Sequence, residues 1–219
     1  MVDVPASTAL RYHLGVRQGG THRVICGLCP SGVDVLDVGC ASGYLGLKLS
    51  ERGCRVWGVD LDSRALQSVP CGSYEEVREL DLNAAEQLPF GPRQFEVVIA
   101  ADVLEHLADP EQALRMLVNA LTPDGTLIVS LPNVANFSIR LPLLFGRFNY
   151  TETGILDRTH WHLYTFRSAL QLLEDAGLHI IKIHAGSDRF GRFLNSSPAV
   201  LRLLGGLFAY NIVCVGRRA

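Results

Sequence analysis

A glycine-rich segment, Val35–Gly46, is the part of the sequence with the clearest capacity for ligand chemistry. An apolar run ends at Asp37 and leads directly into glycines at positions 39, 43 and 46, where the backbone can turn tightly and a ligand can approach closely. The spacing differs from the G-x-G-x-x-G of dinucleotide sites, and no Gly-Lys-Ser/Thr follows as in a phosphate-binding P-loop. The segment therefore predicts a nucleoside-like ligand without phosphates.

Two carboxylates at the ends of later apolar runs could complete such a site. Asp60 ends the second run, where it could accept hydrogen bonds from both ribose hydroxyls, and Asp81 follows the third run. Open α/β sheets bind ligands in the crevice beyond the carboxyl ends of their strands. Asp60 could instead cap the next helix, although Asp62 competes for that position, and Asp81 could be a turn residue.

These segments resemble those of a known family. VLDVGCASGYLG followed by VWGVDLD is similar to motif I and the acidic second-strand end of class I S-adenosylmethionine-dependent methyltransferases. FEVVIAADVLEHLADP resembles the fourth-strand motif of quinone-biosynthesis and MetW-like members. The resemblance implies that the cofactor is S-adenosyl-L-methionine, with its methionine moiety over Gly39–Gly43, its ribose on Asp60 and its adenine edge at Asp81-Leu82. It implies these cofactor-binding residues: Asp37, Gly39, Cys40, Ala41, Gly43, Tyr44, Asp60, Leu61, Asp81, Leu82, Ala101, Asp102 and His106.

The methyl acceptor needs a positioned base if its nucleophile is a hydroxyl. The best candidates lie in GILDRTHWHLYT, because a segment of this kind follows the fifth strand in related methyltransferases. The resemblance suggests that His160 reaches the acceptor, with Asp157 or Arg158 orienting it or the substrate. A structural clasp between lid and sheet is the alternative. We also expect substrate contact from Phe137 and Tyr12, although burial in the helix interface is the favoured alternative for Tyr12.

Two further groups of residues could bind a metal, and we expect neither to do so. Asp102, Glu105 and His106 follow the fourth apolar run and resemble the E-x-x-E-H cluster of some quinone-type relatives, but the first position is Asp. Cys26 and Cys29 lack the second ligand pair that a zinc site requires.

The elements that must position these residues follow from periodicity. From residue 33 onward, short apolar runs alternate with amphipathic stretches, which predicts βαβ units. The resemblance implies an α/β, Rossmann-like class I methyltransferase fold, with a seven-stranded, mostly parallel sheet, helices on both faces and an antiparallel C-terminal strand. We expect one domain over residues 1–219, consisting of a helical segment (1–32), a cofactor-binding half (33–131), an acceptor-site lid (132–165) and a C-terminal part with a helix and strands (166–219).

The pattern also predicts individual elements. Strands are expected at 33–38, 55–59, 76–80, 95–100, 125–131, 178–184 and 209–216, and helices at 44–52, 63–68, 110–121 and 167–176. We expect a turn at Thr122–Gly125 before the fifth strand and another helix within 185–208. The apolar stretches Leu141–Phe145 and Ala199–Ala209 could cover a greasy pocket or touch a membrane surface, and we favour a lid or core role.

The composition limits the classes of binding partner and the cellular location that we expect. The net charge of −2, from 20 basic and 22 acidic residues, lacks the basic excess of a nucleic-acid binder. The 6 scattered cysteines favour free thiols and a cytoplasmic location. No signal peptide or membrane span is apparent. The resemblance implies a methyltransferase, and with the lack of a basic excess we expect it to act on an oxygen of a small molecule, sugar, glycan or natural-product intermediate, with a homodimer left open. The alternatives are a cofactor-binding partner or sensor module without strong catalysis, and a nicotinamide-dependent oxidoreductase.

Overall fold

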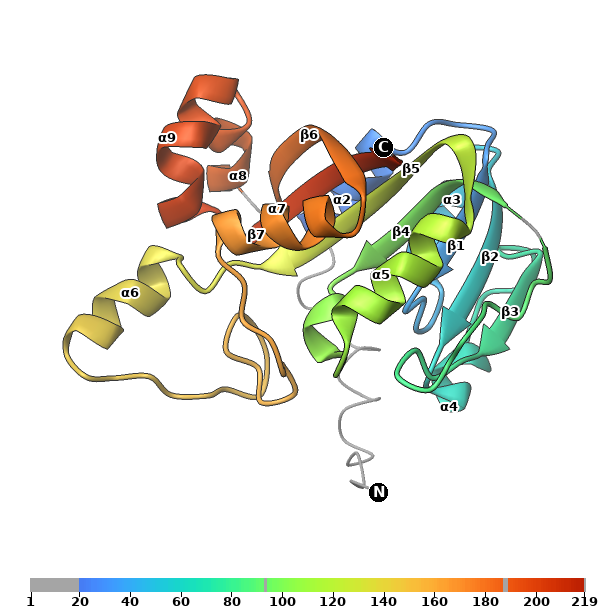
Figure 1. The fold of residues 1–219 in the computed structure, drawn as a ribbon, viewed down its shortest axis with the longest axis horizontal. Coiled ribbons are helices and arrows are strands. Elements are labelled where there is room, and N and C mark those ends of the chain that lie inside the picture. Colours follow the sequence, from blue (N-terminus) through green and yellow to red (C-terminus); the bar gives the residue numbers. More distant parts are fainter. Residues whose placement is uncertain (1–19, 93, 187–188, 219) are drawn as a thin grey trace.

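The computed structural model describes residues 20–92, 94–186 and 189–218, and its strands form one seven-stranded sheet in the order β3-β2-β1-β4-β5-β7-β6 (Figure 1). The strands are β1 (Asp34–Val38), β2 (Arg55–Asp60), β3 (Glu76–Glu79), β4 (Phe95–Ala101), β5 (Leu121–Pro132), β6 (Leu178–Gly186) and β7 (Asn211–Arg218). The helices are α2 (Thr21–Leu28), α3 (Tyr44–Ser50), α4 (Ser63–Leu66), η1 (Leu104–His106), α5 (Pro110–Asn119), α6 (Phe137–Leu144), α7 (Phe166–Asp175), α8 (Arg189–Leu194) and α9 (Pro198–Phe208).

The pairing of the strands confirms the predicted fold class. Strands β1 to β5 pair in parallel, whereas β7 is antiparallel to both of its neighbours, β5 and β6. The strand order reverses between β1 and β4, since the chain runs outward from β1 to β3 and then returns to the other side of β1. Such a switch point opens a crevice at the carboxyl ends of the strands.

Successive side chains of each central strand face opposite sides of the sheet, as the strand period of two requires. Leu36 of β1 is buried in the same cluster as Leu114 of α5, on the face that α5 and α7 cover. Its neighbour Val35 is buried with Leu49 of α3, on the face that α2 and α3 cover. Figure 1 shows α5 and α7 in front of the sheet, so the expected three-layer arrangement is present.

Side-chain caps fix where two of the front helices begin. The Asp109 side chain accepts the N–H of Gln112 at 2.8 Å, with Pro110 in the first turn of α5. Thr165 and Ser168 form a reciprocal capping box at the start of α7. These caps set the points at which the loops beyond β4 and the lid return to the body of the protein.

The structure corrects two details of the C-terminal half. We expected Thr122–Gly125 to form a turn before the fifth strand, but these residues lie inside β5, where the pairing with β4 jumps from Leu121 to Thr126. An irregularity in the strand accommodates their turn-forming residues. The connection between β6 and β7 holds two helices, α8 and α9, where we expected one.

The predicted lid begins directly after β5. Its two ends lie side by side. The N–H of Val134 donates to the carbonyl of Tyr164 at 2.8 Å, and Asn133 forms an isolated bridge with Tyr164. The buried Asn133 and Asn136 side chains both donate to the carbonyl of Ala209, at 2.9 and 3.0 Å. The base of the lid is therefore fixed to the end of α9, while α6 buries none of its residues.

No helix among the described residues combines the length and the apolar character that crossing a membrane demands.

Candidate functional site

The glycine-rich loop sits at the switch point and is bound to the neighbouring strand. The N–H groups of Gly39 and Cys40 donate to the carbonyl of Val59 at 2.8 and 3.1 Å. Gly39 has a φ of +71°, and a Cβ there would lie 2.5 Å from a methyl of Val103. Gly43, with a φ of +82°, forms the N-cap of α3. Glycine is therefore required both for the turn and for the close approach of the chain beyond β4.

Tyr74 packs against the glycine-rich loop and supports it by hydrogen bonds. The sequence did not predict this role. The Tyr74 hydroxyl donates to the carboxylate of Asp37 at 2.5 Å and accepts the N–H of Gly46 at 3.1 Å. Its ring occupies the space that a side chain at Gly46 or Gly58 would need. Burial raises the pKa of Asp37 to about 7. Asp37 is thus a buried structural support of the loop, 1% exposed, rather than an open ligand group.

Asp60 lies at the end of β2 and is oriented by the backbone on both sides. One carboxylate oxygen accepts the N–H of Ala41 at 2.7 Å, and the other accepts the N–H of Asp62 at 2.8 Å. Asp62 accepts the N–H groups of Arg64 and Ala65 and is the N-cap of α4. The structure therefore resolves the alternative that the sequence left open, because Asp62 caps the helix and Asp60 faces the glycine-rich loop. Burial raises the pKa of Asp60.

The residues predicted to lie near the adenine differ in how exposed they are. Asp81 is exposed and accepts the N–H of Asn83 at 2.9 Å, so it forms the turn that was the alternative and keeps its other oxygen accessible. Leu82 is buried in the core, whereas Leu61 is 58% exposed. Asn83 accepts the N–H of Ala108 at 2.7 Å, which ties the loop after β3 to the residues that follow η1.

Asp102 follows Ala101 at the end of β4, and hydrogen bonds within the protein hold its carboxylate. Its backbone adopts a φ of +55°. One oxygen of its carboxylate accepts the hydroxyl of Ser130 at 2.8 Å and the amide of Asn211 at 2.7 Å. Asp102 thereby links β4, β5 and β7, and it is not among the residues whose potential ligand atoms meet at Glu105 and His106.

Glu105 and His106 instead meet His160 of the lid. One potential ligand atom from each of the three lies within 4.8 Å of the others. The rings of His106 and His160 are 4.8 Å apart and meet edge to face. The carboxylate of Glu105 is buried and has no hydrogen-bond partner among the described residues. Burial, together with the charge of Asp102, raises the pKa of Glu105 well above its usual value.

This cluster offers acid–base chemistry, and its residue types could also hold a divalent ion. The carbonyl of Ile155 can only accept, so the Nδ1 of His160, 3.0 Å away, carries a hydrogen. The hydroxyl of Thr159 donates to Asp157 at 2.7 Å and therefore accepts from the Nδ1 of His106 at 3.1 Å. In its neutral form, each ring consequently carries its lone pair on Nε2. Burial and the adjacent His160 lower the pKa of His106, which favours its neutral form.

The remaining acceptor-side residues are less closely grouped. The carboxylate of Asp157 binds the backbone and hydroxyl of Thr159, so the hydrogen bond that orients the His160 ring comes from Ile155 and not from Asp157. Arg158 forms an exposed ion pair with Glu152 at 3.2 Å, within the lid. Phe137, 49% exposed, lies at the start of α6. Tyr12 lies outside the described residues.

The lid segment is held against the carboxyl end of β4. The carbonyl of Glu105 accepts the N–H groups of Trp161 and His162 at 2.8 and 3.2 Å. The ring of His162 approaches the carbonyl of Ala108, with its Nε2 at 3.4 Å, so His162 has a different environment from His160. A clasp between lid and sheet is therefore present, and it brings His160 to the edge where the cofactor loop also lies.

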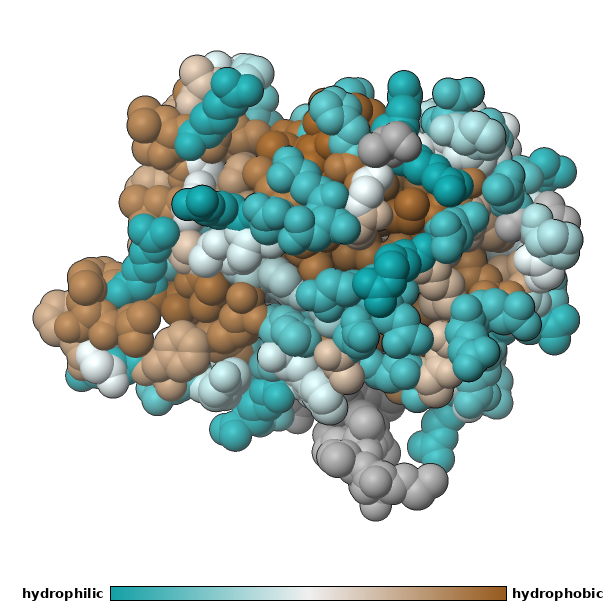
Figure 2. Space-filling view, viewed as in Figure 1, coloured by the Kyte–Doolittle hydropathy of each residue, from teal (hydrophilic) through white to brown (hydrophobic). Residues whose placement is uncertain are grey.

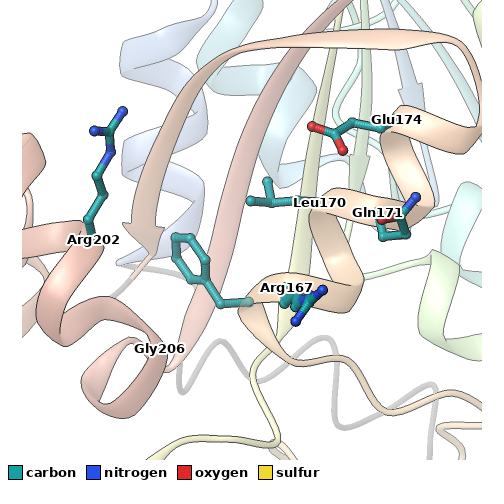
Figure 3. Close-up of a pocket in the computed structure, with 7 residues that line it drawn as sticks. Arg167, Leu170, Gln171, Glu174, Arg202 and Gly206 are labelled. Atoms are coloured by element: carbon teal, nitrogen blue, oxygen red, sulfur yellow. The ribbon is translucent and has the colours of Figure 1, made fainter.

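A separate pocket lies between α7 and α9 (Figure 3). Figure 3 shows Arg167, Leu170, Gln171 and Glu174 projecting from one helix and Arg202 from the other. None of the predicted cofactor-binding or catalytic residues lines this pocket. The functional assignment therefore rests on the residues at the carboxyl ends of the parallel strands.

The cysteines, all of which lie within the described ranges, form no disulfide. All 6 are free, and Cys26 and Cys29 lie in and just after α2. Cys40 is 5% exposed within the glycine-rich loop, and burial raises the pKa of its thiol. The expectation of free thiols is confirmed.

Comparison with known proteins finds one family whose model matches this chain. The model of a methyltransferase domain matches residues 19–183. Among curated proteins, the ubiquinone biosynthesis O-methyltransferase of Idiomarina loihiensis is 37% identical over 105 residues, which cover 47% of this chain and 43% of that protein. The corresponding protein of Azoarcus sp. is 36% identical over 124 residues, covering 55% and 52%. The chain thus spans about half the length of the curated relatives it matches.

A solved structure extends the likeness over nearly the whole chain. An S-adenosylmethionine-dependent methyltransferase from Mesorhizobium loti superposes with a TM-score of 0.67 at 17% identity, covering 92% of this chain and 99% of that one. At this identity the likeness supports the fold alone.

Proposed function

Because the chain belongs to the methyltransferase-domain family, we propose that it transfers the methyl group of S-adenosyl-L-methionine to a hydroxyl oxygen of a small molecule, sugar, glycan or natural-product intermediate. The observation that carries the proposal is the meeting, at one sheet edge, of the glycine-rich loop with Asp60 and of His160 with His106. The name of the curated relatives supports oxygen as the nucleophile.

The residues present fit this cofactor. Gly39 packs directly against Val103, where a Cβ would lie 2.5 Å from a methyl group, so glycine sets the turn that places the loop beside Asp60. Each oxygen of Asp60 accepts one backbone N–H, which leaves lone pairs on both for the ribose hydroxyls. The exposed Asp81 and Leu61 frame the place for the adenine. Tyr44 and Ala101, at the start of α3 and the end of β4, adjoin the methionine position.

The chain's own contribution to the reaction is positioning and proton transfer. The bound cofactor supplies an activated methyl group and a neutral leaving group. The Nε2 of His160 accepts the proton of the acceptor hydroxyl as its oxygen attacks the methyl carbon. The carbonyl of Ile155 holds the ring in the required tautomer, and Asp157 fixes the adjacent Thr159. The lid, residues 132–165, covers the acceptor, with Phe137 and Arg158 as contacts.

The state of the thiols supports a cytoplasmic location for this activity. All 6 cysteines are free, as a reducing compartment would keep them.

A methylation screen with a histidine variant tests the proposal. Phenols, catechols, sugars and hydroxylated natural-product intermediates would be incubated with labelled S-adenosylmethionine. We expect His160→Ala to lower turnover of the accepted substrate by about 100-fold or more, as loss of a general base does, and to change affinity for S-adenosylhomocysteine by less than about twofold. His162→Ala, whose ring approaches Ala108 instead, is the matched control and should retain turnover.

Three outcomes would count against the proposal. Equal losses of turnover and cofactor affinity in His160→Ala would identify His160 as a structural clasp. Formation of S-adenosylhomocysteine no faster than background with every acceptor would favour the sensor module. Binding of a nicotinamide cofactor, with no affinity for S-adenosylmethionine, would identify an oxidoreductase.

A further inference from the structure

One flank of the molecule exposes several large apolar side chains close together. We define the apolar arm as residues 137–150, which comprise α6 and the loop after it. Every residue from 140 to 150 is exposed, and Leu144 and Phe145 are 80% and 74% exposed. Leu203, on α9, is 81% exposed. A contiguous apolar patch of this kind marks an interaction site more often than an incidental surface.

The apolar arm and α9 form one continuous face. The rings of Phe137, in the arm, and Phe208, at the end of α9, are in contact, with centroids 5.6 Å apart. Asn136, which caps α6, donates to the carbonyls of Phe208 and Ala209 and so ties the two elements together. Figure 2 shows apolar residues gathered on this flank, over α6 and α9 as labelled in Figure 1.

The two stretches of chain that form this face carry charges of one sign. Between residues 137 and 150, and between 192 and 208, the sequence contains no acidic residue, although acidic residues outnumber basic ones in the whole chain. The charged side chains of these two stretches are all exposed arginines, at Arg140, Arg147, Arg192 and Arg202. The face therefore combines exposed leucine and phenylalanine with positive charge.

We propose that the apolar arm and α9 dock on the surface of an anionic lipid bilayer. Apolar side chains of an interfacial element enter the boundary between headgroups and acyl chains, while its basic side chains meet the anionic headgroups. Leu144, Phe145 and Leu203 supply the first kind of contact, and the arginines supply the second. Docking does not depend on the proposed methyl transfer, but it would place the lid where an acceptor carried by the membrane could reach it.

The charges argue against a second copy of the chain as the occupant. A two-fold symmetric dimer places the same patch on both subunits. Arginines from each copy would then face arginines from the other, with no carboxylate in either stretch to pair with them. An anionic bilayer provides the missing negative charge, which a self-complementary interface on this face does not.

Vesicle co-sedimentation of the whole protein tests the proposal. Vesicles of pure phosphatidylcholine would be compared with vesicles that contain phosphatidylglycerol at about one lipid in three. We expect binding to the anionic vesicles that weakens as salt is added. The double variant Leu144→Ser/Phe145→Ser should reduce it more than tenfold, and Arg140→Gln or Arg147→Gln about fivefold each. Because the substituted side chains are all exposed, these variants should keep their fold and their affinity for S-adenosylhomocysteine.

Matched controls separate this face from general stickiness. Ile181→Ser removes an exposed apolar residue on β6, and Arg115→Gln removes an exposed arginine on α5. Both should bind anionic vesicles like the unchanged protein. The proposal is overturned if anionic vesicles do not pellet the protein, or if the arm variants and the controls bind equally. It is also overturned if the protein forms a dimer that the Leu144→Ser/Phe145→Ser variant dissociates while vesicle binding is absent.

Discussion

At the scale of single residues, Asp60 illustrates how one side chain can build a site and serve it. Its two oxygens accept N–H groups from Ala41 of the glycine-rich loop and from Asp62, which holds the carboxylate in one orientation. The remaining lone pairs point to a ligand that can donate two hydrogen bonds, as vicinal ribose hydroxyls do. Asp62, and not Asp60, caps the N-terminus of α4.

Removing this carboxylate should weaken cofactor binding. We expect Asp60→Ala to lower affinity for S-adenosylhomocysteine more than tenfold, because charge-assisted hydrogen bonds to the ribose are lost. Asp62→Ala is the matched control. It should cost about 1 kcal/mol of stability through the lost cap while leaving affinity nearly unchanged. Titration calorimetry measures the affinities and urea unfolding the stability, and an Asp60→Ala protein with normal affinity would show that the ribose lies elsewhere.

Glu105 gives the protein a predictable dependence of stability on pH. Its carboxyl has a raised pKa in the folded state because it is buried without a partner among the described residues. Between the unfolded-state pKa of about 4.3 and the higher folded-state pKa, the folded protein binds more protons than the unfolded chain. The free energy of unfolding must therefore fall as pH rises through this interval.

Replacing Glu105 by glutamine should flatten that decline. We expect the free energy of unfolding of Glu105→Gln to fall less steeply than that of the unchanged protein as the pH is raised above about 4.3. Urea unfolding at a series of pH values measures the difference. Parallel pH profiles for the two proteins would contradict the prediction, because they would mean that the pKa of Glu105 is the same in the folded and unfolded states. Asp37, whose pKa is raised to about 7, contributes equally to both profiles.

At the scale of elements, Tyr74 determines how closely α3 can approach the sheet. It precedes β3 and lies beneath the glycine-rich loop, where it contacts Asp37 of β1 and Gly46 of α3. A Cβ at Gly46 would overlap the Tyr74 ring. The third glycine of the G-x-x-x-G-x-x-G pattern is therefore explained by helix packing rather than by ligand contact.

Two glycines in helices should respond in opposite directions to alanine. Gly46→Ala forces Tyr74 to move and should cost about 1–3 kcal/mol of stability, as overpacking does. A methyl group added at Gly27, in α2, would have no neighbour within 4 Å, so Gly27→Ala should stabilise the protein by about 0.5–1 kcal/mol. Urea unfolding measures both. If Tyr74 supports the loop, Gly46→Ala should also weaken cofactor binding, whereas Gly27→Ala should not.

Most of the sheet could be predicted from the sequence, and the acid–base cluster could not. The strands are short apolar runs whose pattern is local, so each expected strand is present with small shifts at its ends. The meeting of Glu105 with His160 depends on how the lid folds back, which no local pattern records. Tyr74 was missed for the same reason, because its partners Asp37 and Gly46 are distant in sequence. α6 was missed because its apolar residues have no amphipathic period.

At the scale of the whole molecule, the cofactor should act as a stabilising ligand. A ligand that binds only the folded state at 100 times its dissociation constant adds about 2.7 kcal/mol. For a chain of this size, each kcal/mol raises Tm by about 2–4 °C. We therefore expect saturating S-adenosylhomocysteine to raise Tm by about 5–10 °C. Thermal unfolding with and without the ligand measures the shift, which should shrink in Asp60→Ala. Absence of any shift in the unchanged protein would contradict the cofactor assignment.

The position of β7 has a consequence for how the chain is made. β7 lies between β5 and β6, although it follows both in sequence. During synthesis, β5 leaves the ribosome with one edge unpaired, and β6 emerges with no neighbour to join. Both must wait for Asn211–Arg218, so an exposed strand edge persists while the connecting helices are translated. A ribosome that pauses within this stretch would hold the nascent chain in the state most open to aggregation and most in need of a chaperone.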